Sequence, residues 1–178
     1  SDIVGLLSNW NSSCESPLGE RELRQCIASA LRNGTPRDDK PQGTLPLTDT
    51  GNAERLVTRF GSNVRHCHPW KKWRIWDGPR WEVDDRGAVM AMSKDVVRGI
   101  YKEAGEIEDK RLREDTAKWA KASEKVDRRK AMVDLARSEH GVPIAPSDFD
   151  SDPNLLNCSN GTLDLKTFVL RPHRREDY

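Results

Sequence analysis

The stretch from Trp70 to Trp81 constrains the fold of this chain more than any other segment. Its twelve residues hold four of the six tryptophans, four cationic side chains and one acid. Asp77-Gly78 lies between two apolar runs, and both residues tolerate the positive φ of a tight turn, so the stretch predicts a β-hairpin. With a two-residue loop Trp76 faces Pro79 and Arg74 faces Trp81, whereas with a four-residue loop from Asp77 to Arg80 Trp76 faces Trp81.

Both registers place Trp76 and Trp81 on one face of the hairpin and Trp73 and Ile75 on the other, because side chains alternate along a strand. A hairpin with indoles on both faces needs cover on both sides. We expect helices between residues 88 and 140 to cover one face. Either a C-terminal β-meander or another molecule covers the other.

The composition describes a polar, helix-rich chain. Hydrophobic residues make up 35% and charged residues 33% of 178 positions, and the net charge is +1, which gives no general attraction to nucleic acid but leaves room for local basic patches. No apolar run approaches a membrane span and no signal-peptide pattern is present, so we expect no membrane partner and a cytoplasmic location. The four cysteines form no C-x-x-C pair and are interpreted as free thiols.

Three segments follow one another along the chain. Residues 1–32 predict a small helical unit, and residues 33–47, rich in proline and glycine, predict a linker. Residues 48–178 predict the main domain. The chain lacks an initiating Met and stops among charged residues, so we expect both ends to be cut from a longer protein.

The main domain is predicted to be α+β, mainly helical, with the hairpin and a short C-terminal meander. A helix begins among several capping residues at 48–52 and stops at Gly61. Two or three helices follow between 88 and 140, one of them with an apolar stripe at helical spacing: Leu112, Thr116, Trp119, Ser123 and Val126. The meander is expected at 155–158, 162–165 and 168–170.

Two clusters have the residue types of metal sites. His66-Cys67-His68 contains zinc-ligand chemistry, but three adjacent residues on an extended segment cannot all face one ion, so a strand edge leading into the hairpin is the simpler interpretation. Asp148, Asp150 and Asp152 alternate, and an extended backbone would aim them to one side, where they could bind a divalent cation. An acidic turn before Pro153 explains them more simply.

A basic and aromatic run precedes and enters the hairpin. It contains no acid and interleaves cations with indoles: Arg65, Trp70, Lys71, Lys72, Trp73 and Arg74. Cations contact phosphates and exposed indoles stack on bases, so this run is a candidate platform for single-stranded DNA. Burial of the tryptophans in a core is the alternative. Arg171, Arg174 and Arg175 form a second, smaller basic cluster.

Several separated motifs resemble one family. Thr48-Asp49-Thr50-Gly51-Asn52-Ala53-Glu54-Arg55, then residues 73–81, then Phe149 to Asn157 and Asn160 to Leu165, occur in the order and spacing of the domain that precedes the superfamily-3 helicase in phage- and plasmid-type and poxvirus-type primase-helicases. The resemblance covers about residues 48–178. Residues 1–32 resemble the helical C-terminal extension of a primase.

The resemblance implies a mobile-element replication protein in a bacterial cell, encoded by a phage or plasmid. This chain would be its non-catalytic connector, with DNA, other copies in a ring, and the adjoining primase and helicase domains as partners. The chain has neither G-x-x-x-x-G-K-[ST] nor G-x-G-x-x-G, so it needs no cofactor of its own. ATP and magnesium would belong to the helicase, expected to begin beyond Tyr178.

Two alternatives from other functional classes stay open at this point. The domain could be a purely structural oligomerisation collar without DNA contact. More remotely, it could be a metal-dependent nuclease built on Asp148, Asp150 and Asp152.

Overall fold

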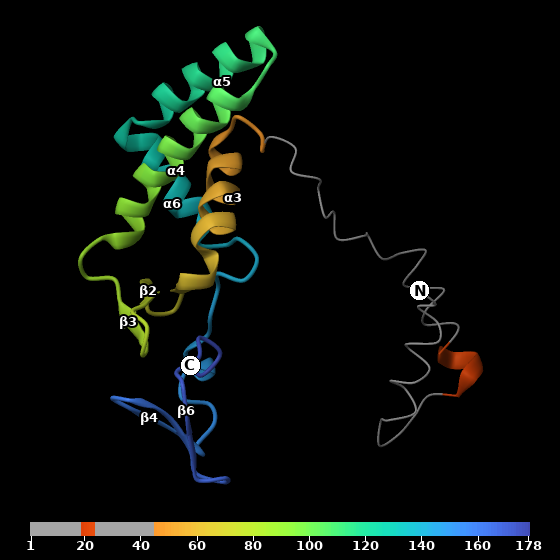
Figure 1. The fold of residues 1–178 in the computed structure, drawn as a ribbon, viewed down its shortest axis with the longest axis vertical. Coiled ribbons are helices and arrows are strands. Elements are labelled where there is room, and N and C mark those ends of the chain that lie inside the picture. The colour runs from red at the N-terminus through yellow and green to blue at the C-terminus, as the bar shows by residue number, and fades with distance from the viewer. Residues whose placement is uncertain (1–18, 24–44) are drawn as a thin grey trace. The chain divides into compact units, whose positions relative to one another are not determined.

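Helices and two small sheets make up the main domain in the computed structural model, which describes residues 19–23 and 45–178 (Figure 1). Residues 20–23 are helical; the rest of the predicted helical unit, and the predicted linker up to residue 44, lie outside the described residues. In chain order the elements are α3 (Asp49–Phe60), η1 (Gly61–Asn63), β1 (Val64–Cys67), β2 (Lys72–Trp76), β3 (Trp81–Val83), α4 (Ala88–Glu106), α5 (Lys110–Ser123), α6 (Val126–Ala136), η2 (Pro146–Asp148), β4 (Leu155–Cys158), β5 (Gly161–Asp164) and β6 (Val169–Arg171).

The start of α3 is fixed by polar contacts to the segment before it. Thr48 caps the helix, since its hydroxyl accepts a hydrogen bond from the Gly51 amide at 3.0 Å. The buried Arg55 guanidinium donates to the carbonyl oxygens of Leu45 and Pro46, at 2.6 and 2.9 Å, and forms an ion pair with Glu103 of α4 at 3.0 Å. The chain therefore enters the domain along a fixed path.

The apolar core lies between α3, α4, α6 and the first sheet. Its buried members are Ala53 and Leu56 of α3, Val64 of β1, Val89, Val96 and Val97 of α4, and Met132, Val133 and Ala136 of α6. Their spacing, i and i+3 in α3, i, i+7 and i+8 in α4, and i, i+1 and i+4 in α6, places them on one side of each helix. Burial of these side chains is the main force that holds the helices against the sheet.

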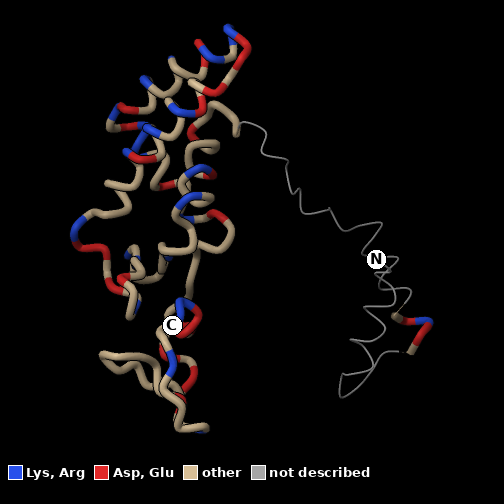
Figure 2. The backbone as a smooth tube through the Cα atoms, viewed as in Figure 1, with Lys and Arg blue, Asp and Glu red and all other residues tan. Residues whose placement is uncertain are grey.

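A buried polar group joins α3 to α5. The Asn52 side chain donates to the Ser123 hydroxyl at 3.0 Å and accepts from the Trp119 indole at 3.1 Å, so both of its polar ends are satisfied. Thr116 is also buried, but the predicted stripe is wrong at its ends, since Leu112 and Val126 are 43% and 60% exposed. The chain turns at residues 124–125, so Val126 begins a new helix instead of continuing α5. Charged residues of both signs are distributed along α5 (Figure 2).

The predicted hairpin is confirmed, and β1 extends it to a three-stranded antiparallel sheet in the order β1-β2-β3. Trp76 is paired directly with Trp81, which selects the four-residue loop. Asp77 closes this loop, because its amide donates to the Arg80 carbonyl at 3.0 Å and its carboxylate accepts from the Arg80 amide at 2.8 Å. Gly78 has φ 114°, a conformation that favours glycine.

The predicted C-terminal meander is confirmed as a second three-stranded antiparallel sheet, β4-β5-β6. With α3 and the three helices between residues 88 and 140, it completes the predicted α+β fold. Among the described residues, the helices are all too short or too polar to span a bilayer.

Gly51 provides a test of the fixed entry path. A Cβ at this position would lie 2.0 Å from the Pro46 carbonyl oxygen, whereas nothing lies within 4 Å of a Cβ at Gly105, near the end of α4. Helix propensity alone would make both Gly→Ala changes stabilising by up to about 1 kcal/mol. We expect Gly51→Ala to lower the free energy of unfolding by roughly 1–3 kcal/mol through overpacking, and Gly105→Ala to raise it slightly. Urea unfolding of both variants measures the change in the free energy of unfolding. If Gly51→Ala stabilised the domain, the close contact between Gly51 and Pro46 would be wrong.

Candidate nucleic-acid interface

The two faces of the first sheet have different surroundings. The register places Val64, His66, Trp73 and Ile75 on one face, and Val64, Trp73 and Ile75 pack with the apolar core. Arg65, Arg74, Trp76 and Trp81 share the opposite face. This second face, here called the outer face, carries most of the aromatic and basic chemistry that the sequence indicates.

A continuous row of aromatic rings covers the outer face. Trp76 lies 5.5 Å from Trp81 and Trp81 stacks on Tyr178 at 5.8 Å; Tyr178 meets Phe149 edge-on at 6.0 Å, and Phe149 stacks on Trp70 at 5.4 Å (all distances between ring centroids). These spacings lie within the range of favourable aromatic pairs. We call the five rings Trp76, Trp81, Tyr178, Phe149 and Trp70 the aromatic array.

Two guanidinium groups lie against the array. Arg65 lies 4.8 Å above the Trp81 ring and donates to the Tyr178 hydroxyl at 3.0 Å. Arg74 lies over both Trp70 and Phe149, at 5.1 and 5.2 Å. Cations above aromatic faces are attracted by the ring quadrupole, so each arginine links two segments that are distant in sequence.

Backbone contacts hold the same segments together. The Trp81 indole donates to the Arg175 carbonyl at 2.8 Å, the Asp150 amide donates to the Tyr178 carbonyl at 2.7 Å, and the Asn157 side chain donates to the Pro79 carbonyl at 3.0 Å. The hairpin, the segment after η2 and the C-terminal residues therefore form one arrangement on the outer face.

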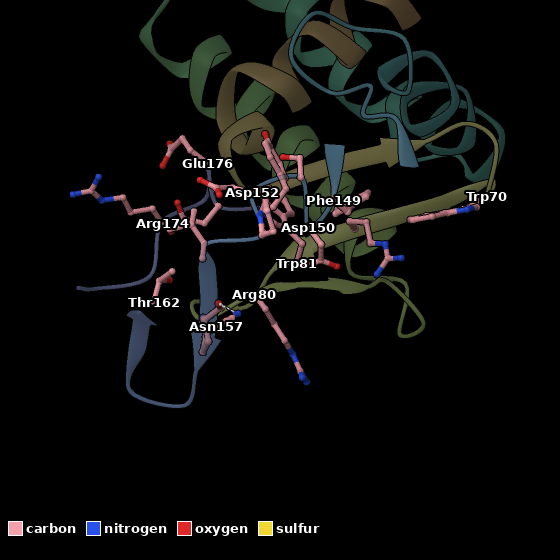
Figure 3. A pocket seen from close by; sticks show the side chains of 17 residues that line it. Trp70, Arg80, Trp81, Phe149, Asp150, Asp152, Asn157, Thr162, Arg174 and Glu176 are labelled. Carbon is pink, nitrogen blue, oxygen red and sulfur yellow. Dashed lines mark hydrogen bonds between the residues drawn. The ribbon is translucent and has the colours of Figure 1, made fainter. Parts of the chain in front are cut away.

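A pocket of about 470 Å³ lies where these three segments meet (Figure 3). Its aromatic lining comes from four rings of the array: Trp70, Trp81, Phe149 and Tyr178. Trp70 lies at one end of the group of side chains and Arg174 at the other, and Arg80 and Arg174 extend outward from it. The pocket is thus aromatic inside with cations at its edge.

Carboxylates also line the pocket, and some of them already have partners. Asp177 forms a bidentate ion pair with Arg171, with one N–O distance of 2.8 Å, and these hydrogen bonds hold the pKa of Asp177 below its ordinary value. Asp152 accepts hydrogen bonds from the amide and side chain of Asn154, which lower its pKa as well. Asp150 and Glu176 complete the acidic lining.

The predicted DNA-binding run separates into exposed and engaged residues. Lys71 and Lys72 are exposed, and Trp70 is 42% exposed at the open end of the array. Trp73 lies on the inner face, packed against the core and against His66, so it is not available for stacking on a base. Arg65 is half-buried and also donates to the Gly61 and Val64 carbonyls, which gives it a structural role.

Arg174 and Arg175, the predicted second basic cluster, differ in their contacts. Arg174 is exposed and lines the pocket. Arg175 donates to the Asn63 side chain at 2.9 Å and helps to fix the C-terminal segment.

Among the described residues the metal candidates do not form one cluster: the His66 and His68 rings meet edge to face with their centroids 4.5 Å apart, but no third possible ligand is grouped with them. Asp148 caps η2 by accepting from the Ala145 amide at 2.8 Å, and Asp150 has φ 51°, so the extended backbone assumed for these aspartates is wrong. His66 is buried on β1, whereas His68 is exposed and bonds to the Arg137 carbonyl. In the described part of the chain, no group of three or more His, Cys, Asp or Glu is placed to hold an ion.

Phe149, Tyr178, Trp81 and Arg80 belong to the interface but were not among the predicted site residues. Phe149 and Tyr178 are far in sequence from the hairpin, and no periodicity links them to it. The sequence feature that could have indicated Phe149 and Tyr178 is the presence of a single aromatic residue in each of two otherwise acidic and polar segments.

His66 gives the domain a pH-dependent stability. Burial disfavours the charged imidazole, and the neighbouring His68 and Arg137 side chains act in the same direction, so the pKa of His66 is lowered to about 4. A histidine in the unfolded chain has a pKa of about 6.5, so the unfolded state binds the proton first as the pH falls. The contribution of neutral His66 to stability is therefore fully present above about pH 7 and is lost as the pH falls from 6.5 to 4, by up to roughly 3 kcal/mol.

We expect His66→Phe to remove most of this decline, since phenylalanine cannot be protonated. His68→Gln, at the exposed neighbour, should leave most of it. Urea unfolding at pH 7.5 and 4.5 measures the difference for each protein. An equal loss of stability in the wild type and His66→Phe would contradict this assignment.

Comparison with known proteins places the domain in a family. The family described as D5 N terminal like matches residues 53–178, most of the chain. No curated protein and no solved structure matches the chain. The match agrees with the resemblance carried by the hairpin and by the closing motifs. The chain belongs to the D5 N-terminal-like family, the N-terminal domain of D5-like primase-helicases.

Proposed function

We propose that this domain is a connector in a DNA primase-helicase, without catalytic activity of its own, and that it contacts single-stranded DNA through the outer face of the first sheet. It would couple the primase to the helicase by holding the strand between them. The family gives the context of DNA replication. The proposed DNA contact is supported by the exposed aromatic and basic residues of the outer face.

The observation that carries the proposal is the exposed end of the aromatic array. Trp70 is 42% exposed, yet its ring is held by Phe149 on one side and by the Arg74 guanidinium. Lys71 and Lys72 follow it directly and have no ion-pair partner among the described residues. A fixed indole beside exposed cations matches the combination of base stacking and phosphate contact used by single-strand binders.

Charge reversal tests this contact. We expect Lys71→Glu/Lys72→Glu to lower the affinity for a 15-nucleotide single strand roughly tenfold or more at 100 mM salt. The slope of log affinity against log salt should become shallower by about 0.7 for each phosphate that the variant no longer neutralises. Fluorescence anisotropy over a salt series measures both quantities.

Lys94→Glu/Lys102→Glu is the matched control, because both lysines are exposed on α4 and the net-charge change is the same. This control should keep most of the affinity and the salt slope. Equal losses in the two double variants would mean that only net charge matters, and the proposed contact would be wrong.

A second candidate function is an oligomerisation collar, and the second sheet favours it. Leu156, Leu163 and Leu170 are paired across β4, β5 and β6, so they form one row on one face. Leu156 and Leu170 are about half exposed, and Phe168, in the turn directly before β6, is 79% exposed. The sheet carries few charged positions (Figure 2). Two identical rows are self-complementary, so the partner in this proposal is a second copy of the chain.

Sedimentation velocity tests the collar. We expect the chain to form dimers or larger assemblies without DNA, and Leu156→Lys/Leu170→Lys to return it to the monomer, because charge on the leucine row opposes apolar burial. Thr167→Lys, at an exposed turn position, controls for added charge alone. A chain that is monomeric at every concentration, with and without oligonucleotide, would rule the collar out.

A further inference from the structure

We propose that the pocket on the outer face accepts a single nucleobase that carries an exocyclic amine, so that cytosine is bound in preference to uracil or thymine. This inference rests on the proposed function, because it concerns a base of the strand that contacts Trp70, Lys71 and Lys72. It adds selectivity to a contact that would otherwise be indifferent to sequence.

The pocket has the dimensions and walls of a site for a small planar ligand. Its volume of about 470 Å³ lies within the range of small-molecule sites, roughly 300–1,000 Å³. Trp81, Phe149 and Tyr178 present aromatic surface to it, and their mutual contacts fix the rings in place. An aromatic wall that is already ordered binds a base without a further loss of side-chain freedom.

The charges of the pocket favour a base over a phosphate in its interior. Four acids (Asp150, Asp152, Glu176 and Asp177) and three arginines (Arg74, Arg80 and Arg174) line it; Asp177 is paired with Arg171, and Arg80 and Arg174 point outward, so carboxylate charge remains in the interior. A phosphate would meet this negative charge, whereas a neutral base would not. Arg80 and Arg174 point outward, where they could contact the phosphates on either side of the bound nucleotide (Figure 3).

The hydrogen-bonding groups left over in the pocket include carboxylate acceptors, whereas the arginine donors Arg80 and Arg174 point outward. Asp150 and Glu176 have no side-chain hydrogen bond or ion pair with other described residues. The Asn157 side-chain amide donates one N–H to the Pro79 carbonyl, which leaves its oxygen as an acceptor and its second N–H as a donor. The Asp150 amide is tied to the Tyr178 carbonyl, which holds this acidic residue beside the aromatic wall.

A carboxylate acceptor placed opposite the 4-position of the ring distinguishes cytosine from uracil and thymine at that position. Cytosine presents an N4 amine that can donate to a carboxylate, whereas uracil and thymine present an O4 oxygen that would face the carboxylate as a second acceptor. A site that hydrogen-bonds one substituent rejects the analogue that leaves its polar groups unpaired. Asp150 is the residue we assign to this role.

The test compares dC and dU oligonucleotides of 12 residues by fluorescence anisotropy at pH 8, where short cytosine tracts stay single-stranded. The wild-type chain should bind dC at least about tenfold more tightly than dU, the range of a charge-assisted hydrogen bond. Asp150→Asn should reduce this ratio to about threefold or less, because an amide can donate to O4 as well as accept from N4. Asp85→Asn, an exposed position outside the pocket with the same charge change, should keep the wild-type ratio.

Equal affinity for dC and dU, or an unchanged ratio in Asp150→Asn, would overturn the inference. The same titrations separate this failure from that of the proposed function. If Lys71→Glu/Lys72→Glu weakens both oligonucleotides while dC and dU bind equally, the DNA contact stands and the base pocket is wrong. If neither oligonucleotide binds the wild-type chain, both proposals are wrong.

Discussion

The stack of cations and aromatic rings on the outer face of the first sheet is the interaction on which the rest of this domain depends. A three-stranded sheet of this size cannot bury two faces of large side chains by itself. One face packs on the helical core through Val64, Trp73 and Ile75. The other is closed by segments far away in sequence, through Tyr178 over Trp81 and Phe149 over Trp70, with Arg65 and Arg74 between them.

This construction explains how a structural stack can also present a binding surface. Trp81 is buried and the Trp76, Phe149 and Tyr178 rings are half-buried, whereas Trp70 is exposed at the end of the array, next to two exposed lysines. The pocket is formed by the same contacts, since its lining comes from the hairpin, the segment after η2, the C-terminal residues and three residues of the second sheet. Stability and recognition therefore rest on the same side chains. Disrupting Tyr178 or Phe149 would alter the pocket and loosen the sheet together.

The sequence was a good guide to local structure and a poor guide to contacts over long distances. Asp77-Gly78 and the alternation of the tryptophans predicted the hairpin and which residues share a face, because turn chemistry and strand period are local properties. The residues of β1 were predicted only as a strand edge leading into the hairpin, because adjacent His66 and Cys67 do not show a clear alternation of polar and apolar side chains. The pairing of Phe149 and Tyr178 with the hairpin left no periodic signal. The alternation of Asp148 and Asp150 in sequence also led to a wrong prediction, because Asp150 has a positive φ and the backbone there is not extended.

Photo-crosslinking tests the central claim that the open end of this stack meets single-stranded DNA. A 15-nucleotide strand that carries 5-bromodeoxyuridine at each position in turn would be irradiated with the chain, and the crosslinked peptides identified by mass spectrometry. Because the photoreaction favours an aromatic side chain in contact with the base, we expect Trp70 to be the main crosslinked residue, with Phe149 next. Crosslinks confined to α4 or α5, or to Trp119, would show that DNA binds elsewhere and would contradict the account.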